Sequence, residues 1–257
     1  MKKKLSILVS NDDGIDSDGI YSLVSSLKKI ANVIVVAPDT QQSAVGHAIT
    51  MHRPLRVKEF RKKGKFFGYA VDGTPADCVK LGIRHLIKHK PDLVVSGINH
   101  GSNTAISVIY SGTVSAATEG TILGIPSIAI SLTSYEPKVD FSVAAQFAQK
   151  LAKIVAEKGL PKGTLLNVNV PHVSKKQIKG VEITRQGKSS WNDEFEARKD
   201  PGNKNYFWLK GDLIEIDEED DIDQKAIMNN KISITPIQYD LTNYNFLKDL
   251  SDWNIKY

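Results

Sequence analysis

A repeated order of segments limits the folds that this chain can adopt: a short apolar run precedes an amphipathic segment, and another apolar run follows. Residues 5–11 (LSILVSN) are apolar, residues 18–31 carry apolar residues at helical spacing, and residues 32–38 are apolar again. Connections this short make the two predicted strands parallel, with a right-handed crossover. Continuously apolar strands are typical of a sheet that helices cover on both faces.

The same order continues along the chain after one interruption. Residues 54–60 and 66–73 alternate in polarity around a basic tip, which predicts an antiparallel hairpin. Thr74 then caps a helix that Pro75 opens and that runs to about His89. Further strands are expected at 92–99, 127–131 and 165–171, and further helices at 112–124 and 140–158. This order predicts an open, doubly wound, mostly parallel α/β sheet, which is a Rossmann-like architecture.

The pattern changes after about residue 180. Segments 180–187, 206–216 and 231–238 resemble strands, and the acidic stretch 217–223 between the last two is expected to be a solvated turn, because it lacks the glycine of a calcium loop. We therefore divide the chain into a catalytic core (1–180) and a carboxyl-terminal β-hairpin extension (181–257). The extension contains too little helix and core to form an independent domain, and exposed hairpins of this kind commonly pair with another subunit.

Composition excludes several classes of protein. With 41% hydrophobic and 25% charged residues the chain is globular, and no apolar run approaches the roughly 20 residues of a membrane-spanning helix. The amino terminus lacks a cleavage site for a signal peptide, and the single cysteine, Cys78, is expected as a buried thiol in a reducing cytoplasm. A net charge of +5 with scattered lysines predicts no nucleic-acid partner, and it fits a small anionic substrate.

Two adjacent carboxylates end the first apolar run. Asp12 and Asp13 follow it, and Gly14 lets the chain turn so that both side chains converge. Convergent hard oxygens select a hard divalent cation, Mg²⁺ or Mn²⁺, whose charge relieves the repulsion between them. The alternative is a turn whose aspartates serve as helix caps, a role that suits Asp18 immediately before the next helix.

Two further polar segments follow apolar runs at the carboxyl edge of the predicted sheet, where doubly wound folds bind ligands. Segment 38–50 is long and polar for a simple connection, and its Ser43 offers a neutral oxygen ligand. In segment 96–103, Asn99 and Asn103 supply amide groups without adding charge. An ordinary turn is the alternative for each segment.

A fourth segment, 110–117 (YSGTVSAA), begins a predicted helix. Ser111, Gly112 and Thr113 stand where free backbone N–H groups and the helix dipole favour an anion such as phosphate. The segment lacks the lysine of a Walker motif, which excludes a P-loop nucleoside triphosphatase.

Other side chains favour simpler interpretations. His85 and His89 stand four apart on a predicted helix, yet no zincin glutamate accompanies them. Trp191, Trp208 and Trp253 are expected in an interface or in the core rather than in a base-stacking platform.

Seven ordered segments resemble the SurE family of survival proteins. They are ILVSNDDGIDSDGI, VVAPDTQQSAVGHAIT, GTPADCVKLG, DLVVSGINHGSN, SGTVSAATEG, TRQGKSSWNDEFE and SITPI, and they extend from residue 5 to about residue 237. A single NDDG is a weak signal, whereas seven segments in one order are specific.

The resemblance implies a metal-dependent phosphatase that acts on nucleoside monophosphates. It also implies a homodimer or homotetramer in which the carboxyl-terminal hairpin reaches a neighbour. Gln42 stands where many relatives carry an arginine, so no guanidinium contact with phosphate is expected there. The resemblance assigns the cation to Asp12, Asp13, Ser43 and Asn99, with Asp12, Asp13 and Asn99 catalytic, and it assigns phosphate to Asn103, Ser111, Gly112 and Thr113.

We therefore expect a cytoplasmic 5′- or 3′-nucleotidase in which one divalent cation activates water, with short polyphosphates left open as further substrates. A carboxylate nucleophile that forms an acyl phosphate is the mechanistic alternative, and it is disfavoured because both carboxylates are committed to the cation. The functional alternatives are a non-enzymatic nucleotide- or metal-binding regulator on the same fold and a glycosyltransferase that uses residues 16–18 at its metal.

Overall fold

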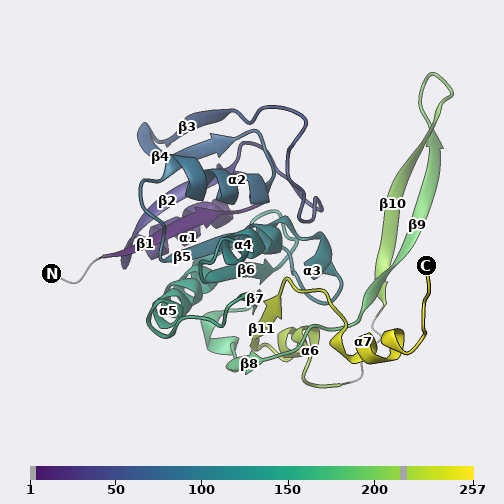
Figure 1. Cartoon of the computed structure of the whole chain (residues 1–257). Helices are drawn as coiled ribbons and strands as arrows, with labels where there is room; N and C mark the ends of the chain where they lie inside the picture. The colour runs from purple at the N-terminus through teal and green to yellow at the C-terminus, as the bar shows by residue number, and fades with distance from the viewer. Residues whose placement is uncertain (1–3, 215–218) are drawn as a thin grey trace.

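The computed structural model describes residues 4–214 and 219–257. These residues form a nine-stranded sheet and a separate two-stranded antiparallel ribbon that projects from the body of the molecule (Figure 1). Across the large sheet the strands are ordered β3 (Val57–Lys62), β4 (Lys65–Val71), β2 (Ala31–Pro38), β1 (Leu5–Ser10), β5 (Leu93–His100), β6 (Ser127–Thr133), β7 (Thr164–Pro171), β11 (Ile232–Gln238) and β8 (Val181–Ile183). The ribbon consists of β9 (Ser190–Lys199) and β10 (Asn205–Ile214).

The direction of winding reverses beside β1. This strand pairs in parallel with β2 on one side and with β5 on the other, and β6 and β7 continue the parallel sheet from β5. The carboxyl ends of β1 and β5 therefore lie side by side at the switch point, where doubly wound sheets bind ligands. The predicted fold class is confirmed, as is the antiparallel hairpin formed by β3 and β4.

Helices cover both faces of the sheet. On one face α1 packs against α5, and on the other α2 packs against α4, each pair over its own apolar cluster. The predicted helical spacing in α1 is confirmed, because Ile20, Leu23, Val24 and Leu27 are all buried. The helix bounds are α1 (Asp18–Leu27), α2 (Pro75–Leu81), α3 (Ser107–Tyr110), α4 (Gly112–Ile122) and α5 (Ser142–Lys158), with a π-helical turn (Gly82–Leu86) after α2 and a 3₁₀ turn (Lys175–Gln177) after β7.

Two predicted helix caps have different outcomes. Thr74 caps α2 as expected: its hydroxyl accepts a hydrogen bond from the Asp77 N–H at 3.1 Å, and the Asp77 carboxylate accepts one from the Thr74 N–H at 2.9 Å. Asp18 is not the cap of α1, because it is the first helical residue and Ser17 precedes it as the N-cap. The Ser17 hydroxyl accepts a hydrogen bond from Asn11 Nδ2 at 2.9 Å, which links the cap to the loop after β1.

The carboxyl-terminal region is divided between the central sheet and the ribbon. Strand β11 pairs antiparallel with β7 and parallel with β8, so that segments 180–187 and 231–238 extend the large sheet. Only β9 and β10 project as a hairpin. Two helices in this mainly β region were not predicted, α6 (Asp223–Met228) and α7 (Tyr244–Ser251).

The acidic stretch 217–223 only partly fits the predicted solvated turn. Residues 217 and 218 lie outside the described residues, and residues 219–221 are exposed. Asp223, however, is buried, and its carboxylate accepts hydrogen bonds from the N–H groups of Ala105 at 2.9 Å and Gly187 at 3.1 Å. The prediction of a solvated turn is therefore wrong for Asp223, whose buried carboxylate accepts hydrogen bonds from the backbone of two other loops.

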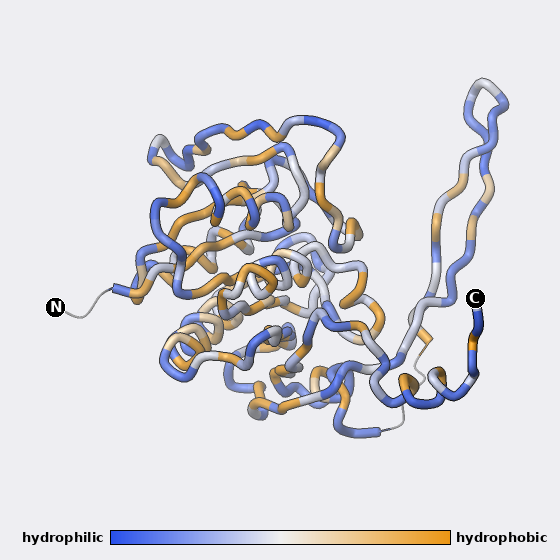
Figure 2. Tube along the Cα trace, viewed as in Figure 1, coloured by the Kyte–Doolittle hydropathy of each residue, from blue (hydrophilic) through white to orange (hydrophobic). Residues whose placement is uncertain are grey.

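Hydropathy along the chain follows this arrangement (Figure 2). Hydrophobic residues concentrate on the central strands, whereas the tip of the ribbon is hydrophilic. Cys78 is fully buried in α2, as predicted. No helix in the described part of the chain has the length and apolar character needed to cross a membrane.

Candidate active site

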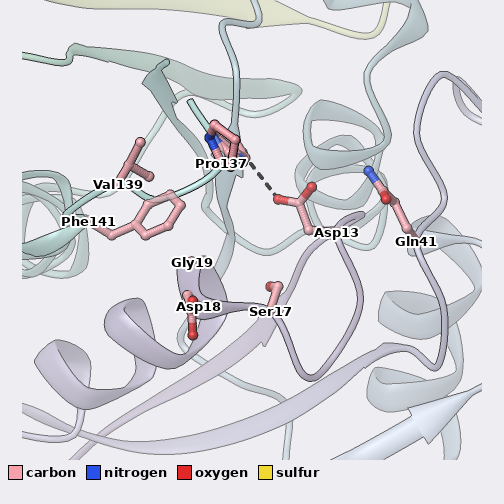
Figure 3. A pocket seen from close by; sticks show the side chains of 9 residues that line it. Asp13, Ser17, Asp18, Gly19, Gln41, Pro137, Val139 and Phe141 are labelled. Carbon is pink, nitrogen blue, oxygen red and sulfur yellow. Dashed lines mark hydrogen bonds between the residues drawn. The ribbon is translucent and has the colours of Figure 1, made fainter. Parts of the chain in front are cut away.

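The loop after β1 carries both predicted carboxylates. Gly14 has a φ of +94°, which L side chains rarely adopt, so the turn after Asp13 requires glycine. Asp12 is only 4% exposed, and the Thr113 hydroxyl donates a hydrogen bond to its Oδ1. Asp13 is half-buried, and its Oδ2 accepts a hydrogen bond from the His100 N–H at 3.2 Å (Figure 3).

The surroundings of both carboxyl groups disfavour the ionised form and raise their pKa values. Burial raises the pKa of Asp12, and hydrogen bonds from the Thr113 hydroxyl and from the N–H groups of Thr113 and Gly112 offset this only in part. Burial, followed by the neighbouring charge of Asp12, raises the pKa of Asp13 to about 7. A cation beside the pair would remove this penalty, because opposite charge favours the ionised form.

Ser43 reaches the site on the long loop of residues 39–50. The loop is attached to the carboxylate segment because the Gln42 N–H donates a hydrogen bond to the Asp12 carbonyl at 2.7 Å. The Ser43 hydroxyl accepts a hydrogen bond from Gln41 Nε2 at 2.8 Å and is exposed to solvent. The serine oxygen is therefore oriented within the site and accessible to a ligand.

A cavity of about 760 Å³ brings three of the four predicted cation ligands together. Asp12, Ser43 and Asn99 line it, and so does Ser111 at the start of α4. Asp13 borders a smaller neighbouring cavity of about 200 Å³, and His100 lines both. Figure 3 shows the Asp13 carboxylate between Val139 and Phe141 on one side and Gln41 on the other.

The donor set is suited to a hard cation. Within the described residues no group of three or more His, Cys, Asp or Glu side chains gathers as a metal site. The oxygen donors are instead two carboxylates, the Ser43 hydroxyl and the Asn99 amide, whose Nδ2 donates to the Gly101 carbonyl at 2.8 Å. Oxygen donors of this kind fit Mg²⁺ or Mn²⁺ better than zinc.

The amino terminus of α4 packs directly against Asp12. A Cβ atom on Gly112 would lie 2.7 Å from Asp12 Cβ, so only glycine permits this approach. Ser111 caps the helix by accepting a hydrogen bond from the Val114 N–H at 3.0 Å. Thr113 is fully buried, and its hydroxyl is occupied by Asp12. All three residues lie at the start of α4, but only Ser111 is among the residues that line the cavity, and phosphate binding by the three stays a prediction. Thr113 also orients a carboxylate, which was not predicted.

Asn103 is not among the residues that line the cavity. It is buried, its Nδ2 donates to Ser131 Oγ at 2.9 Å, and its N–H donates to Asn169 Oδ1 at 2.8 Å. Its carbonyl accepts hydrogen bonds from the side-chain amides of Asn167 and Asn169. These contacts make Asn103 a support of the loop after β5, and a direct phosphate contact stays a prediction.

A buried carboxylate that the sequence analysis missed holds the loop that carries Ser43. Glu119, on α4, has a side chain only 2% exposed, and its Oε2 lies 3.0 Å from His47 Nε2. Its Oε1 lies 2.8 Å from Lys80 Nζ, on α2. The signal in the sequence is a single glutamate within a helix of small residues, because a charge in such a helix requires partners. We call His47, Glu119 and Lys80 the loop latch.

Fold and site together define a doubly wound α/β protein that carries a cavity lined by carboxylate, hydroxyl and amide groups, at the carboxyl edge of its sheet and beside a helix amino terminus. The chain matches the family model described as "Survival protein SurE" over residues 7–193. It belongs to the SurE family, and the resemblance seen in the sequence is confirmed.

The similarity to relatives of known name or structure covers almost the whole chain. A protein named "5′-nucleotidase SurE" from Chlorobium luteolum is 49% identical over 250 residues, which cover 97% of this chain and 96% of that protein. One of the same name from Christiangramia forsetii is 46% identical over 256 residues, which cover 99% of this chain and 98% of that protein. The crystal structure of the SurE protein from Aquifex aeolicus superimposes with a TM-score of 0.84 at 41% identity, covering 97% of this chain and 100% of that one.

Proposed function

We propose that this chain is a divalent-metal-dependent phosphomonoesterase that hydrolyses nucleoside monophosphates, as a 5′- or 3′-nucleotidase. The observation that carries the proposal is the contact between Asp12 and the start of α4, because it brings a cation ligand and an anion-binding helix terminus to one cavity. Relatives that are 45–50% identical over nearly their whole length bear the name 5′-nucleotidase, which supports the same reaction.

The chain would hold one Mg²⁺ or Mn²⁺ ion with Asp12, Asp13, Ser43 and Asn99. Such an ion supplies a Lewis acid that lowers the pKa of a water molecule and offsets phosphoryl charge. Thr113 keeps the Asp12 carboxylate in one orientation. Ser111, Gly112 and Thr113 form the helix terminus that would bind the phosphate, and Asn103 supports the loop that follows Asn99 and the end of β5.

The experiment that tests this function is phosphate release from a panel of 5′- and 3′-nucleoside monophosphates and short polyphosphates, with added Mg²⁺, Mn²⁺ or EDTA. Release that depends on the added cation supports the proposal. Release that chelation leaves unchanged would contradict it. Binding of a nucleotide without any release favours the non-enzymatic regulator instead.

The nucleophile is proposed to be water rather than a carboxylate, because Thr113 fixes Asp12 as a ligand and the His100 N–H holds Asp13. Quenching the enzyme with sodium borohydride during turnover separates the two routes, because borohydride reduces an acyl phosphate on aspartate to homoserine. Unmodified Asp12 and Asp13 in the quenched enzyme, measured by mass spectrometry, support attack by water. Homoserine at either position would contradict it and support an acyl phosphate.

We also propose that the protein works in the cytoplasm as a homodimer or homotetramer, assembled through the ribbon of β9 and β10. The ribbon exposes large apolar side chains, among them Phe195, Phe207 and Trp208. Light scattering on a Phe195→Ser, Phe207→Ser variant tests the assembly. An unchanged mass would exclude the ribbon as the contact.

A further inference from the structure

The base of the ribbon forms part of the wall of the large cavity within the same chain. Trp191 and Asp193 on β9, and Lys210 on β10, line the cavity that Asp12 also lines. The base is attached to the body, because Trp191 Nε1 donates a hydrogen bond to Ser107 Oγ at 3.4 Å. The ribbon therefore contributes to the site of its own subunit in addition to its proposed role in assembly.

Three aromatic side chains from three separate segments line this cavity. Tyr110 ends α3, Tyr135 follows β6 and Trp191 begins β9, and all three are exposed. Tyr135 is 73% exposed, although its ring lies against Gly101, where a Cβ atom would meet Cε1 at 2.7 Å. We call Tyr110, Tyr135 and Trp191 the aromatic wall.

The size of the cavity exceeds what a phosphate group needs. Its volume of about 760 Å³ lies within the range of pockets that enclose whole small molecules. Asp12, Ser43, Asn99 and Ser111 contribute oxygen donors and a helix start to its lining, and the aromatic wall contributes ring surface. A ligand that matches both kinds of lining carries an anionic group and a planar aromatic group.

We propose that the aromatic wall binds the nucleobase of the substrate while the phosphate lies at the start of α4. Aromatic side chains bind nucleobases by stacking, an interaction that removes apolar ring surface from water. The inference rests on the proposed nucleotidase function and adds to it the part of the site that recognises the base. It gives Trp191 a role that the sequence did not predict.

The test compares a substrate that carries a base with one that does not. In Trp191→Ala and Tyr135→Ala, KM for AMP should rise about tenfold with little change in kcat, as expected from loss of one stacking contact. The kcat/KM for glycerol 2-phosphate should stay as in the wild type. Trp191→Phe and Tyr135→Phe keep an aromatic ring, so their KM for AMP should stay near the wild-type value.

Phe66→Ala is the matched control, because Phe66 on β4 is an aromatic residue 46% exposed, lies outside the ribbon and does not line the cavity. It should leave KM for AMP unchanged. The proposal would be overturned if Trp191→Ala and Tyr135→Ala lowered kcat/KM equally for AMP and for glycerol 2-phosphate. It would also be overturned if kcat/KM for AMP did not fall. The nucleotidase function itself would stand in either case, because wild-type turnover of AMP tests it separately.

A binding measurement keeps the inference testable without turnover. Calorimetry with adenosine in EDTA measures binding of the base and sugar alone. Wild-type protein and Phe66→Ala should bind adenosine equally, and Trp191→Ala should bind it about tenfold more weakly. Equal binding by all three proteins would contradict a base-binding role of the aromatic wall, whether or not the enzyme hydrolyses AMP.

Discussion

The Thr113 hydroxyl donates a hydrogen bond to Oδ1 of Asp12, and this contact joins the first turn of α4 to the loop after β1. Both residues are buried, and they lie 101 positions apart in the chain. The contact therefore sets the relative position of two parts of the site, the proposed cation ligand and the helix terminus proposed to bind phosphate.

Replacement of Thr113 by valine keeps the volume of the side chain and removes the donor. Because hydrogen bonds to charged groups contribute about 1.5–3 kcal/mol, we expect kcat to fall about ten- to hundredfold. Thr113→Ser retains the hydroxyl and should stay within a few-fold of the wild type. Steady-state phosphate release at a saturating concentration of the cation measures kcat for both variants. Wild-type turnover in Thr113→Val would show that the contact does not orient the carboxylate.

Gly112→Ala tests the close approach of α4 to Asp12. The added Cβ atom would lie 2.7 Å from Asp12 Cβ, so either the helix start or the carboxylate has to move. Overpacking of this kind costs about 1–3 kcal/mol, which urea unfolding should detect as a lower midpoint. Phosphate release should fall as well, even at low temperature where the variant stays folded. An unchanged midpoint and unchanged turnover would contradict the packing described here.

The loop latch predicts an effect on the affinity for the cation. Glu119→Gln weakens the contacts with His47 and Lys80, and it thereby loosens the loop that carries Ser43. The Mn²⁺ concentration for half-maximal activity should rise several-fold, while kcat at saturating Mn²⁺ changes little. Glu157→Gln, at an exposed position of α5, serves as the control and should change neither value. A fall in kcat without a change in the half-maximal Mn²⁺ concentration would contradict a role of Glu119 in positioning the loop that carries Ser43.

The latch also predicts how stability depends on pH. Burial alone would raise the pKa of Glu119, but hydrogen bonds and charge from His47 and Lys80 outweigh it, and the pKa lies below its ordinary value of 4.5. A lowered pKa in the folded state adds stability above the unfolded pKa, and this stability is lost as the pH falls through the folded value. Between pH 6 and pH 3, the free energy of unfolding should fall more steeply in the wild type than in Glu119→Gln. The same pH dependence of the free energy of unfolding in both proteins would contradict the ion pairs of Glu119 with His47 and Lys80.

The sequence predicts those parts of the structure that local patterns determine. The succession of strands and helices along the chain, the α2 cap at Thr74 and the turn at Gly14 follow from periodicity and from residue type, since each depends on neighbours within a few positions. Asp12, Ser43 and Asn99 could be placed in one site because parallel strands bring their carboxyl ends to one edge.

The remaining features depend on contacts between distant segments. The bond between Thr113 and Asp12, the burial of Glu119 and the burial of Asp223 each join residues far apart in the chain. No periodic pattern encodes such pairs, so Thr113 was expected only at the phosphate and Asp223 only in a solvated turn. The contribution of Trp191 to the cavity is of the same kind, because it depends on how the ribbon leaves the sheet.

The carboxylates after β1 are proposed to hold the cation on which hydrolysis depends. The most direct measurement is phosphate release from AMP by Asp13→Asn with Mn²⁺ present, beside Asp16→Asn as the control. Asp16 lies on the same loop, but it is exposed and pairs with Lys62 at 3.0 Å. We expect Asp13→Asn to fold as the wild type, because the new amide oxygen can accept from the His100 N–H. It should release no phosphate, while Asp16→Asn stays active. Turnover by Asp13→Asn at the wild-type rate would contradict a cation-binding role of the carboxylates after β1.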